Sequence, residues 1–298
     1  MDLIPDWQIY YLRKKQYLRQ SKTVKINHMR RAFYLFTIVA GISLIFSACQ
    51  REQQWEQLFN GNDLSNWDMY LGSSLGSDWD HLAEAATIEE VFSVVEDNGD
   101  NVIRISGVIN GSLATKESYE NYHLKVVFRW GDEVFSRRNS GLLYHSFGDF
   151  GVAFGTWMPN IEFQMMHQSL GDNYLMENTT VETEAVRDEE LGQFVYTPGA
   201  ERLTFGAHAN GRHVRKNPDN ENPLGQWNTI ELYTYGRTAV HVVNGVTVMV
   251  NHNTGTWENG QVQPLTSGKI QIQSEGAELF VRSVEIKPLS GIPAGIMP

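Results

Sequence analysis

Short runs in which apolar and polar residues alternate recur along the chain from residue 102 to residue 286. Alternation with a period of two predicts β-strands that have one buried face. Helical periodicity is scarce, and only His81–Val94 is expected to hold a short helix. The predicted strands are Val102–Ile105, His123–Trp130, Gly141–His145, Asn160–Met165, Thr229–Tyr235, Ala239–Asn244, Thr247–Asn251, Lys269–Gln273 and Glu278–Ile286.

The connections between these strands favour an antiparallel fold. Asn244-Gly245 separates two β-branched alternating runs, which predicts a hairpin with a type I′ turn, because both turn residues need positive φ. Gly72–Asp100 and Met176–Asn222 are polar, irregular and longer than ordinary connections, so we expect functional loops there. A strand-rich chain with such turn signals is typical of an all-β sandwich.

The first 48 residues are expected to be a secretory signal that is not part of the fold. An apolar run, Phe33–Ala48, follows Arg30 and Arg31 and ends directly before Cys49. The run is shorter than the roughly 20 residues that span a bilayer, and a transmembrane anchor is the alternative. Residues 1–28 are too long and irregular for a normal signal start, so we interpret Met29 as the true start.

Cys49 has a candidate role of its own. Phe46-Ser47-Ala48-Cys49 resembles the lipobox of bacterial lipoproteins, although that pattern prefers Leu where this chain has Phe46. The resemblance implies that Cys49 is lipidated and becomes the mature N-terminus, with a short tether over residues 49–54. Several acyl chains exceed the two signals that stable anchoring needs. Because no acidic run follows Cys49, we expect a cell-envelope lipoprotein that faces the periplasm.

The composition is globular, with 41% hydrophobic and 20% charged residues among 298. A single cysteine excludes a disulfide framework and a cysteine-rich metal site. The net charge is −11, and removing residues 1–48 takes away eight Lys/Arg and two Asp/Glu, which leaves −17. Such an acidic chain lacks the basic footprint that binds phosphate backbones, so we expect a neutral substrate and no nucleic-acid partner.

Five segments together resemble, in order, the signature blocks of the 3-keto-disaccharide hydrolase family. They are LFNGNDLSNWDMY, YHLKVVFRWGDEVFSRRNSGLLYH, MPNIEFQMM, PLGQWNTIELYTYGRTAVHVVNGVTVMV and GKIQIQSEGAELFVRSVEIKPL. The resemblance runs from Trp55 to Leu289, so we expect one domain over 55–290 and a tail over 291–298. It implies a concanavalin-like jelly-roll sandwich of two antiparallel sheets. It also implies hydrolysis of glycosides whose glucose 3-hydroxyl has been oxidised to a ketone, a substrate that a sugar 3-dehydrogenase would supply.

Cleavage of such a substrate requires particular catalytic side chains. A ketone at C3 acidifies the C2 hydrogen, so that a base can form an enolate that expels the group on C1 before water adds. This route needs a general base near C2 and a cationic or hydrogen-bonding group on the C3 oxygen. Alternation in Asn160–Met165 sends Glu162 and Gln164 to one polar face. We expect Glu162 to be the general base, and a merely solvated face is the alternative.

A second polar face offers further contacts. Alternation groups Gln271, Gln273 and Glu275 opposite the apolar residues of their strand, and we expect them to bind the sugar. Arg129 is the candidate stabiliser of the enolate, because its fixed donor fork suits an oxyanion. The alternative is a salt bridge between Arg129 and Glu162, which would lower the pKa of the carboxyl.

The segment that begins at Asn139 adds candidates of a different kind. Asn139 is expected either to bind a sugar hydroxyl or to cap a turn, and Gly141 marks a turn or a close approach. Tyr144 and His145 follow on alternate faces, so only one of them is expected to face the site. Tyr144 would contact substrate, and His145 would act as an acid or base.

Several aromatic residues are expected to lie in the core, and one or two near the long loops to stack on a sugar ring. Trp157 is the candidate for that contact. The others are Trp67, Tyr70, Trp79 and Tyr174.

A divalent metal is a candidate cofactor with little support in the sequence. His167 and Asp172 are candidate ligands, together with His145 and Glu162, but no recognised metal-binding spacing connects them.

Two other functions stay open. The protein could be a non-catalytic carbohydrate-binding module of the envelope, because a sandwich alone does not imply catalysis. It could also be an ordinary glycosidase that pairs Glu162 with another acid such as Glu275.

Overall fold

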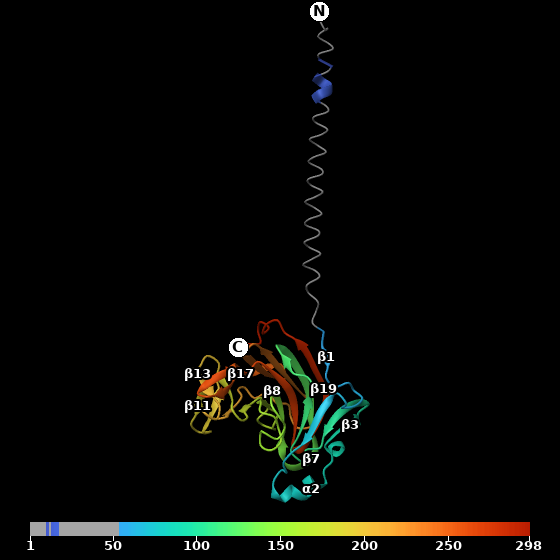
Figure 1. Ribbon diagram of the computed structural model, residues 1–298, viewed down its shortest axis with the longest axis vertical. Helices are drawn as coiled ribbons and strands as arrows, with labels where there is room; N and C mark the ends of the chain where they lie inside the picture. Colours follow the sequence, from blue (N-terminus) through green and yellow to red (C-terminus); the bar gives the residue numbers. More distant parts are fainter. Residues whose placement is uncertain (1–9, 12, 18–53) are drawn as a thin grey trace, which may run out of the picture. The chain divides into compact units, whose positions relative to one another are not determined.

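The computed structural model describes residues 10–11, 13–17 and 54–298 (Figure 1). The chain divides into two units, Met1–Glu52 and Gln53–Pro298, and the described part of the first unit is helical. Within the described ranges, no helix is both long and apolar enough to cross a membrane. The predicted signal run, Met29 and the lipidation site Cys49 lie outside the described residues.

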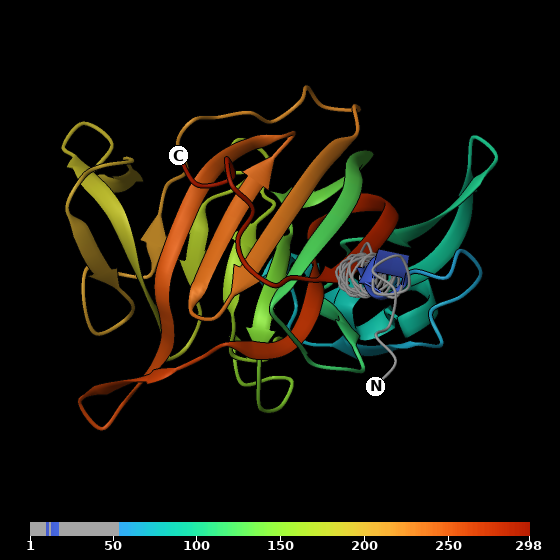
Figure 2. The same ribbon diagram turned by 90° about the horizontal axis from the view of Figure 1, so that it is seen from above.

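The second unit is an all-β sandwich of antiparallel strands, so the predicted jelly-roll fold class is confirmed. One sheet, the back sheet, has the strand order β3–β4–β19–β7–β15–β16–β17–β11–β13. Its long strands run side by side when the domain is seen from above (Figure 2). The bounds are β3 Phe92–Asp97, β4 Asp100–Ile105, β19 Ser267–Pro288, β7 Tyr122–Asn139, β15 Asn228–Tyr235, β16 Thr238–Val243, β17 Val246–Glu258, β11 Thr179–Asp188 and β13 Arg202–Phe205.

The other sheet, the site sheet, has the strand order β2–β5–β19–β8–β9–β10–β14. Its bounds, besides β19, are β2 Trp67–Leu71, β5 Gly111–Thr115, β8 Gly141–Ser146, β9 Ile161–Gln164, β10 Asn173–Leu175 and β14 His213–Val214. Short strands pair at the margins: β1 Glu56–Gln57 and β6 Tyr119–Glu120 with β19, β12 Gln193–Tyr196 with β11, and β18 Gln261–Pro264 with β17.

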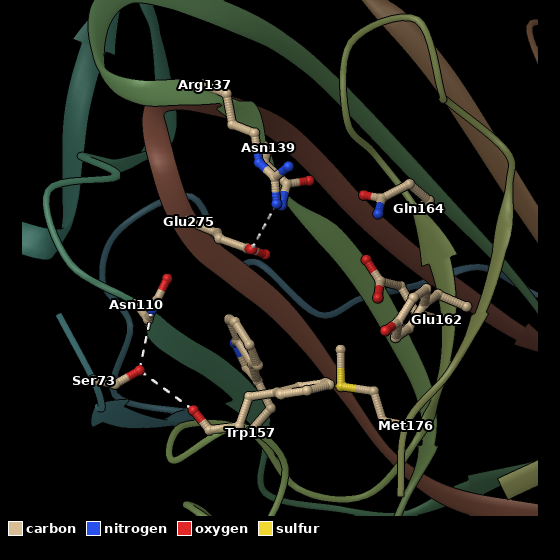
Figure 3. A pocket seen from close by; sticks show the side chains of 11 residues that line it. Ser73, Asn110, Arg137, Asn139, Trp157, Glu162, Gln164, Met176 and Glu275 are labelled. Atoms are coloured by element: carbon tan, nitrogen blue, oxygen red, sulfur yellow. Dashed lines mark hydrogen bonds and ion pairs between the residues drawn. The ribbon is translucent and has the colours of Figure 1, made fainter. Parts of the chain in front are cut away.

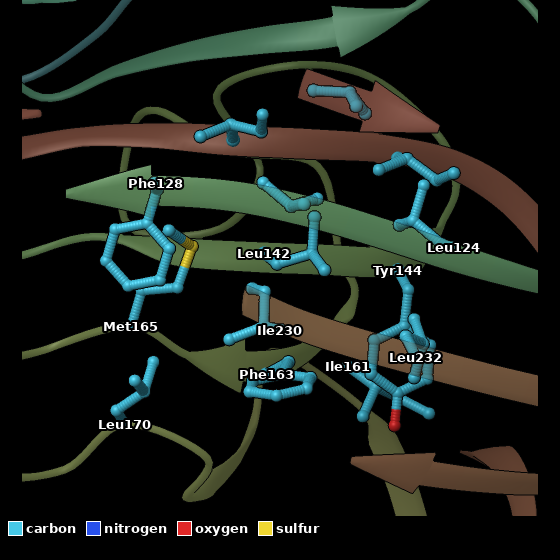
Figure 4. Packing of buried hydrophobic residues seen from close by; sticks show 14 of the residues in the cluster. Leu124, Phe128, Leu142, Tyr144, Ile161, Phe163, Met165, Leu170, Ile230 and Leu232 are labelled. Atoms are coloured by element: carbon cyan, nitrogen blue, oxygen red, sulfur yellow. The ribbon is translucent and has the colours of Figure 1, made fainter. Parts of the chain in front are cut away.

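The hydrophobic core fills the space between the two sheets (Figure 4). Leu124 and Phe128 of β7 meet Leu142 of β8 and Ile161 and Phe163 of β9, and all five are fully buried. Since side chains alternate along a strand, the residues between them point outward, away from the core. The alternation that predicted β9 therefore also determines which residues reach the outer face of the site sheet.

Of two sequence expectations about connections, one is confirmed and one is wrong. His81–Val94 does hold short helices, α2 Asp80–Ala85 and α3 Ile88–Val91, which follow the 3₁₀ turn η1 Ser77–Trp79, and Phe92 already belongs to β3. The stretch Met176–Asn222 holds strands β11 to β14 instead of an irregular loop. The Thr residues of this stretch explain the wrong prediction, because their side chains are polar but are also β-branched, which suits a strand.

The hairpin and the C-terminus are well defined. Asn244 and Gly245 have φ of 48° and 82°, which confirms the predicted turn between β16 and β17. The segment expected as a tail packs on the domain, because Thr247 donates its hydroxyl hydrogen to the carbonyl oxygen of Ile296 at 2.6 Å.

Strand β19 belongs to both sheets. Its first part pairs with β5 and β8 in the site sheet, and its last part pairs with β4 and β7 in the back sheet. The register shifts between Glu275 and Ala277, where β7 bulges over the strand. Gly276 has φ of 98° at this point, and a methyl group there would collide with Ser136 and with the backbone of Arg137.

The domain begins at a packed aromatic residue. Trp55 lies on the outer face of the back sheet, where the Nζ atoms of Lys125 and Lys287 are each 4.6 Å from its ring centroid. His123 meets the same ring edge-on at 4.6 Å between centroids. These contacts secure the start of the domain to the start of β7 and the end of β19.

The strand crossing makes a testable prediction about stability. Gly276→Ala should destabilise the protein by about 2–4 kcal/mol, because a left-handed backbone and a collision add together. Gly245→Ala is the matched control: its φ is also positive, but the added methyl meets nothing within 4 Å. It should cost only about 1–2 kcal/mol. Urea unfolding of both variants measures the difference, and equal losses would contradict the tight crossing.

Candidate functional site

A cavity of about 370 Å³ opens on the outer face of the site sheet (Figure 3). Alternation in β9 places Glu162 and Gln164 there, because Ile161 and Phe163 lie in the core. Tyr174 lies opposite Glu162 on the neighbouring strand β10 and extends the same face. The cavity is lined by Ser73, Asn110, Arg137, Asn139, Phe154, Trp157, Glu162, Gln164, Tyr174, Met176 and Glu275.

The crossing of β19 supplies charged groups to one end of the cavity. Glu275 lies beside Asn139 of β7 in the ladder. The bulge of β7 directs Arg137 into the cavity, where its Nη2 atom is 3.9 Å from Oε1 of Glu275. Glu275 therefore has a cationic neighbour, and the pair faces the cavity.

Glu162 occupies space that only a glycine leaves open. A methyl group on Gly141 would collide with the Oε1 atoms of both Glu162 and Gln273. Glu162 is 3% exposed and Gln273 is 1% exposed. The amide atoms of Gln273 have no hydrogen-bond partner among the described residues. The close approach predicted at Gly141 is confirmed, and two polar side chains make it.

Burial and charge separate the two acids. Burial raises the pKa of Glu275 to about 7, and Arg137 and Asn139 act in the opposite direction. Burial, followed by the charges of Glu275 and Asp172, raises the pKa of Glu162 well above its ordinary value, and Arg137 offsets this only in part. Both carboxyl groups therefore hold their protons more tightly than an exposed glutamate does, and Glu275 exchanges between acid and carboxylate near neutral pH.

The other end of the cavity is apolar. Figure 3 shows Trp157 and Met176 on the side away from Arg137. Trp157 is buried and donates its indole N–H to the carbonyl of Gly111 at 2.9 Å. Phe154 and Tyr174 line the same region, with 6.5 Å between their ring centroids. This end offers aromatic surface rather than charge.

Asn110 and Ser73 line a further, polar side of the cavity. Asn110 donates its side-chain N–H to the hydroxyl of Ser73 at 3.1 Å and to the carbonyl of Ser74 at the same distance. The amide oxygens of Asn110 and Asn139 are buried and have no partner within 54–298. Such acceptors are available to the hydroxyl groups of a ligand.

The structure brings several of the predicted residues together. Glu162, Gln164, Asn139, Glu275 and Trp157 all line the cavity, and they come from three strands and a loop. Gln273 lies directly beside Glu162, next to Gly141.

Arg129 lies outside the cavity, contrary to the prediction. Its Nη2 atom is 3.0 Å from Oδ2 of Asp97, and its guanidinium covers the rings of Phe280 and Trp227 at 4.5 and 5.2 Å. Because Phe128 lies in the core, Arg129 points outward from the back sheet. The alternative salt bridge to Glu162 is also wrong, since Asp97 is its partner.

Neither Tyr144 nor His145 lines the cavity. Tyr144 lies in the core between the sheets, where its hydroxyl oxygen accepts a hydrogen bond from Asn251 at 3.3 Å. His145 has φ of 51°, so the alternation of β8 ends at this residue. Burial lowers the pKa of His145 to about 3, which keeps the ring neutral.

Gln271 holds strands together instead of facing the ligand. Ser112 donates its hydroxyl hydrogen to Oε1 of Gln271 at 2.8 Å, and Nε2 of Gln271 donates to the hydroxyl of Ser146 at 2.7 Å. Both ends of the amide are therefore occupied by neighbouring strands.

The two candidate metal ligands are engaged elsewhere. His167 pairs with Glu221 at 2.9 Å, and Asp172 pairs with His213 at 2.8 Å and accepts a hydrogen bond from the backbone of Lys216. Across the parts of the chain that the structure describes, no three His, Cys, Asp or Glu residues are grouped to hold a metal ion.

Sequence reasoning missed part of the cavity, namely Ser73, Asn110, Arg137, Phe154 and Met176. Arg137 carried one signal, because it lies two residues before Asn139, a predicted contact. The others come from loops, whose positions a strand pattern does not describe.

Comparisons with solved structures show weak likeness. One is a proposed glycosyl hydrolase from Parabacteroides distasonis, which is 20% identical, with 79% of this chain and 100% of that chain covered and a TM-score of 0.46. Carbohydrate-binding module CBM66 from Bacillus subtilis is 9% identical, with 74% and 97% covered and a TM-score of 0.39. A Bacillus subtilis protein of unknown function with a galectin-like fold is 9% identical, with 78% and 94% covered and a TM-score of 0.42.

Comparison with curated proteins finds no match. The match that does extend along the sandwich is to a protein family. Residues 54–287, from just before β1 to the last residues of β19, match the 3-keto-alpha-glucoside-1,2-lyase-like domain. This chain therefore belongs to the 3-keto-alpha-glucoside-1,2-lyase-like family.

Proposed function

We propose that this protein cleaves the glycosidic bond of 3-keto-glycosides by elimination and then adds water to the product. Membership of the family supports the class of substrate. One observation carries the mechanism: a single cavity holds two buried carboxyl groups of different proton affinity, and a guanidinium group lies beside one of them. Pairs of acids whose pKa values are pushed apart can divide the roles of base and acid.

Glu275 is the general base in this proposal. Its pKa of about 7 makes the carboxylate available at neutral pH, and it takes the hydrogen from C2 as the enolate forms. Arg137 faces the same space and stabilises the negative charge that develops on the C3 oxygen. The structure thus favours Glu275 over Glu162 as the base, because Glu162 has no comparable cationic partner and holds its proton more tightly.

Glu162 is the general acid. It donates its proton to the departing oxygen while the C1–O bond breaks, and a double bond forms between C1 and C2. For hydration, Glu162 takes a proton from water as the hydroxyl adds to C1, and Glu275 returns its proton to C2. Both carboxyl groups then regain their starting states, so each cycle is balanced.

A second candidate is an ordinary glycosidase. Glu162 and Glu275 line one cavity. Most glycosidases use a pair of carboxyl groups on either side of the scissile bond. Such an enzyme would accept sugars that carry no ketone.

We also propose a place for the protein in the cell, on the strength of the sequence alone. Lipidation at Cys49 would hold it at the envelope, facing the periplasm. Its substrate would come from oxidation of a glycoside 3-hydroxyl by a sugar 3-dehydrogenase.

Substitution of either acid should affect catalysis and not substrate binding. Glu275→Gln and Glu162→Gln should each lower kcat by about 100-fold or more, because each removes one proton transfer, and KM should change little. Glu285→Gln is the control on β19, since Glu285 pairs with Lys125 on the opposite side of the sandwich. Steady-state kinetics of the three variants provides the measurement, and full activity of either cavity variant would refute its role.

Stability should fall as the pH rises. In the folded state the pKa of Glu275 is raised from 4.5 to about 7, so folding takes up a proton between these values. The associated stability is fully present below pH 4.5, and about 3 kcal/mol is lost as the pH rises through 7. Urea unfolding at pH 5, 6, 7 and 8 should show a steeper decline for the wild type than for Glu275→Gln. Parallel curves would contradict the shift.

The choice between the two reactions needs one comparison of substrates. The purified protein should cleave a 3-keto-disaccharide and leave the same unoxidised disaccharide intact, as followed by release of monosaccharide. Cleavage of the plain sugar would favour the ordinary glycosidase. Parallel reactions with a chelator test for a metal ion, and unchanged rates are expected from the residues that line the cavity.

A further inference from the structure

The apolar end of the cavity has no part in the proton transfers, yet one of its residues is held in an unfavourable state. Phe154 is 52% exposed and has φ of 50°. A bulky residue rarely adopts this left-handed backbone, and exposing an aromatic ring has a further cost. Unfavourable conformations of this kind gather at functional sites.

The surrounding loop is built to hold Phe154 in place. Backbone hydrogen bonds join Gly151 to Thr156 at 3.1 Å and Ala153 to Trp157 at 2.8 Å. Ser73 donates its hydroxyl hydrogen to the carbonyl oxygen of Phe154 at 3.3 Å. The exposed ring therefore belongs to a fixed turn with several anchors.

Tyr174 completes the surface beside the ring. The two ring planes are tilted by 51°, so together they form an open corner instead of a closed stack. Tyr174 lies opposite Glu162 in the ladder, so this corner adjoins the acid that protonates the departing oxygen. The charged groups Arg137 and Glu275 lie at the other end of the cavity (Figure 3).

We infer that Phe154 and Tyr174 bind the leaving group, and that this group is a ring with an apolar face. The inference rests on the proposed function and defines its substrate class further. The oxidised ring occupies the charged end, because its reaction needs Glu275 and Arg137. The departing ring then stacks on the aromatic corner, as the C–H face of a pyranose or the face of an arene does.

The test compares leaving groups of different shape. The 3-keto-glucosides of methanol, p-nitrophenol and glucose are given to the wild type and to Phe154→Gly. Glycine suits the positive φ, so the loop should be preserved. We expect kcat/KM to fall about tenfold for the two ring leaving groups and less than twofold for methanol. If one ring substrate alone responds, it identifies the kind of ring that the corner prefers.

Two variants guard against a merely structural effect. Phe154→Tyr keeps an aromatic face and should retain at least half of the wild-type kcat/KM. Val152→Ala changes a residue of the same loop that is 53% exposed but does not line the cavity, and it should leave all three rates unchanged. Equal losses on all three substrates in Phe154→Gly would overturn the inference.

Binding separates this inference from the proposed function. If the wild type cleaves none of the three glucosides, the proposed function fails and calorimetry decides the role of the corner. Unoxidised p-nitrophenyl glucoside and methyl glucoside are then titrated into the wild type and Phe154→Gly. A loss of affinity confined to the p-nitrophenyl compound supports the aromatic corner, and equal affinities refute it.

Discussion

The passage of β19 from one sheet to the other is the constraint on which both the fold and the site depend. A single strand has to change partners within three residues, and the ladder accommodates this only through a bulge in β7 and a glycine at position 276. The same bulge aims Arg137 at Glu275. The distortion that joins the sheets therefore also creates the charged end of the cavity.

The two acids of the cavity, Glu162 and Glu275, have different neighbours. Burial acts on both carboxyl groups, but Glu275 lies beside a guanidinium, whereas Glu162 lies among other acids and an amide without a partner. An acid pair of this kind opposes folding at neutral pH, so the site reduces the stability of its own scaffold. Functional sites commonly carry such a cost.

Period-two alternation predicted the sheet faces well and the site only partly. It placed Glu162 and Gln164 correctly, but Arg129 obeys the same rule and emerges on the opposite side of the sandwich. Alternation distinguishes the core from the outside, and it contains no information about which of the two outer faces a strand will present. Alternation did not predict where Arg137 and His145 lie, because a bulge in β7 and the positive φ of His145 interrupt the period of two. Phe154 and Ser73 lie on loops, whose positions follow from tertiary packing.

The packing of Trp55 has a consequence for access. The residue that begins the domain is secured by two lysines to the outer face of the back sheet, whereas the cavity opens on the outer face of the site sheet. The contacts that order the start of the domain therefore share no side chain with the cavity, so access to the cavity does not depend on them.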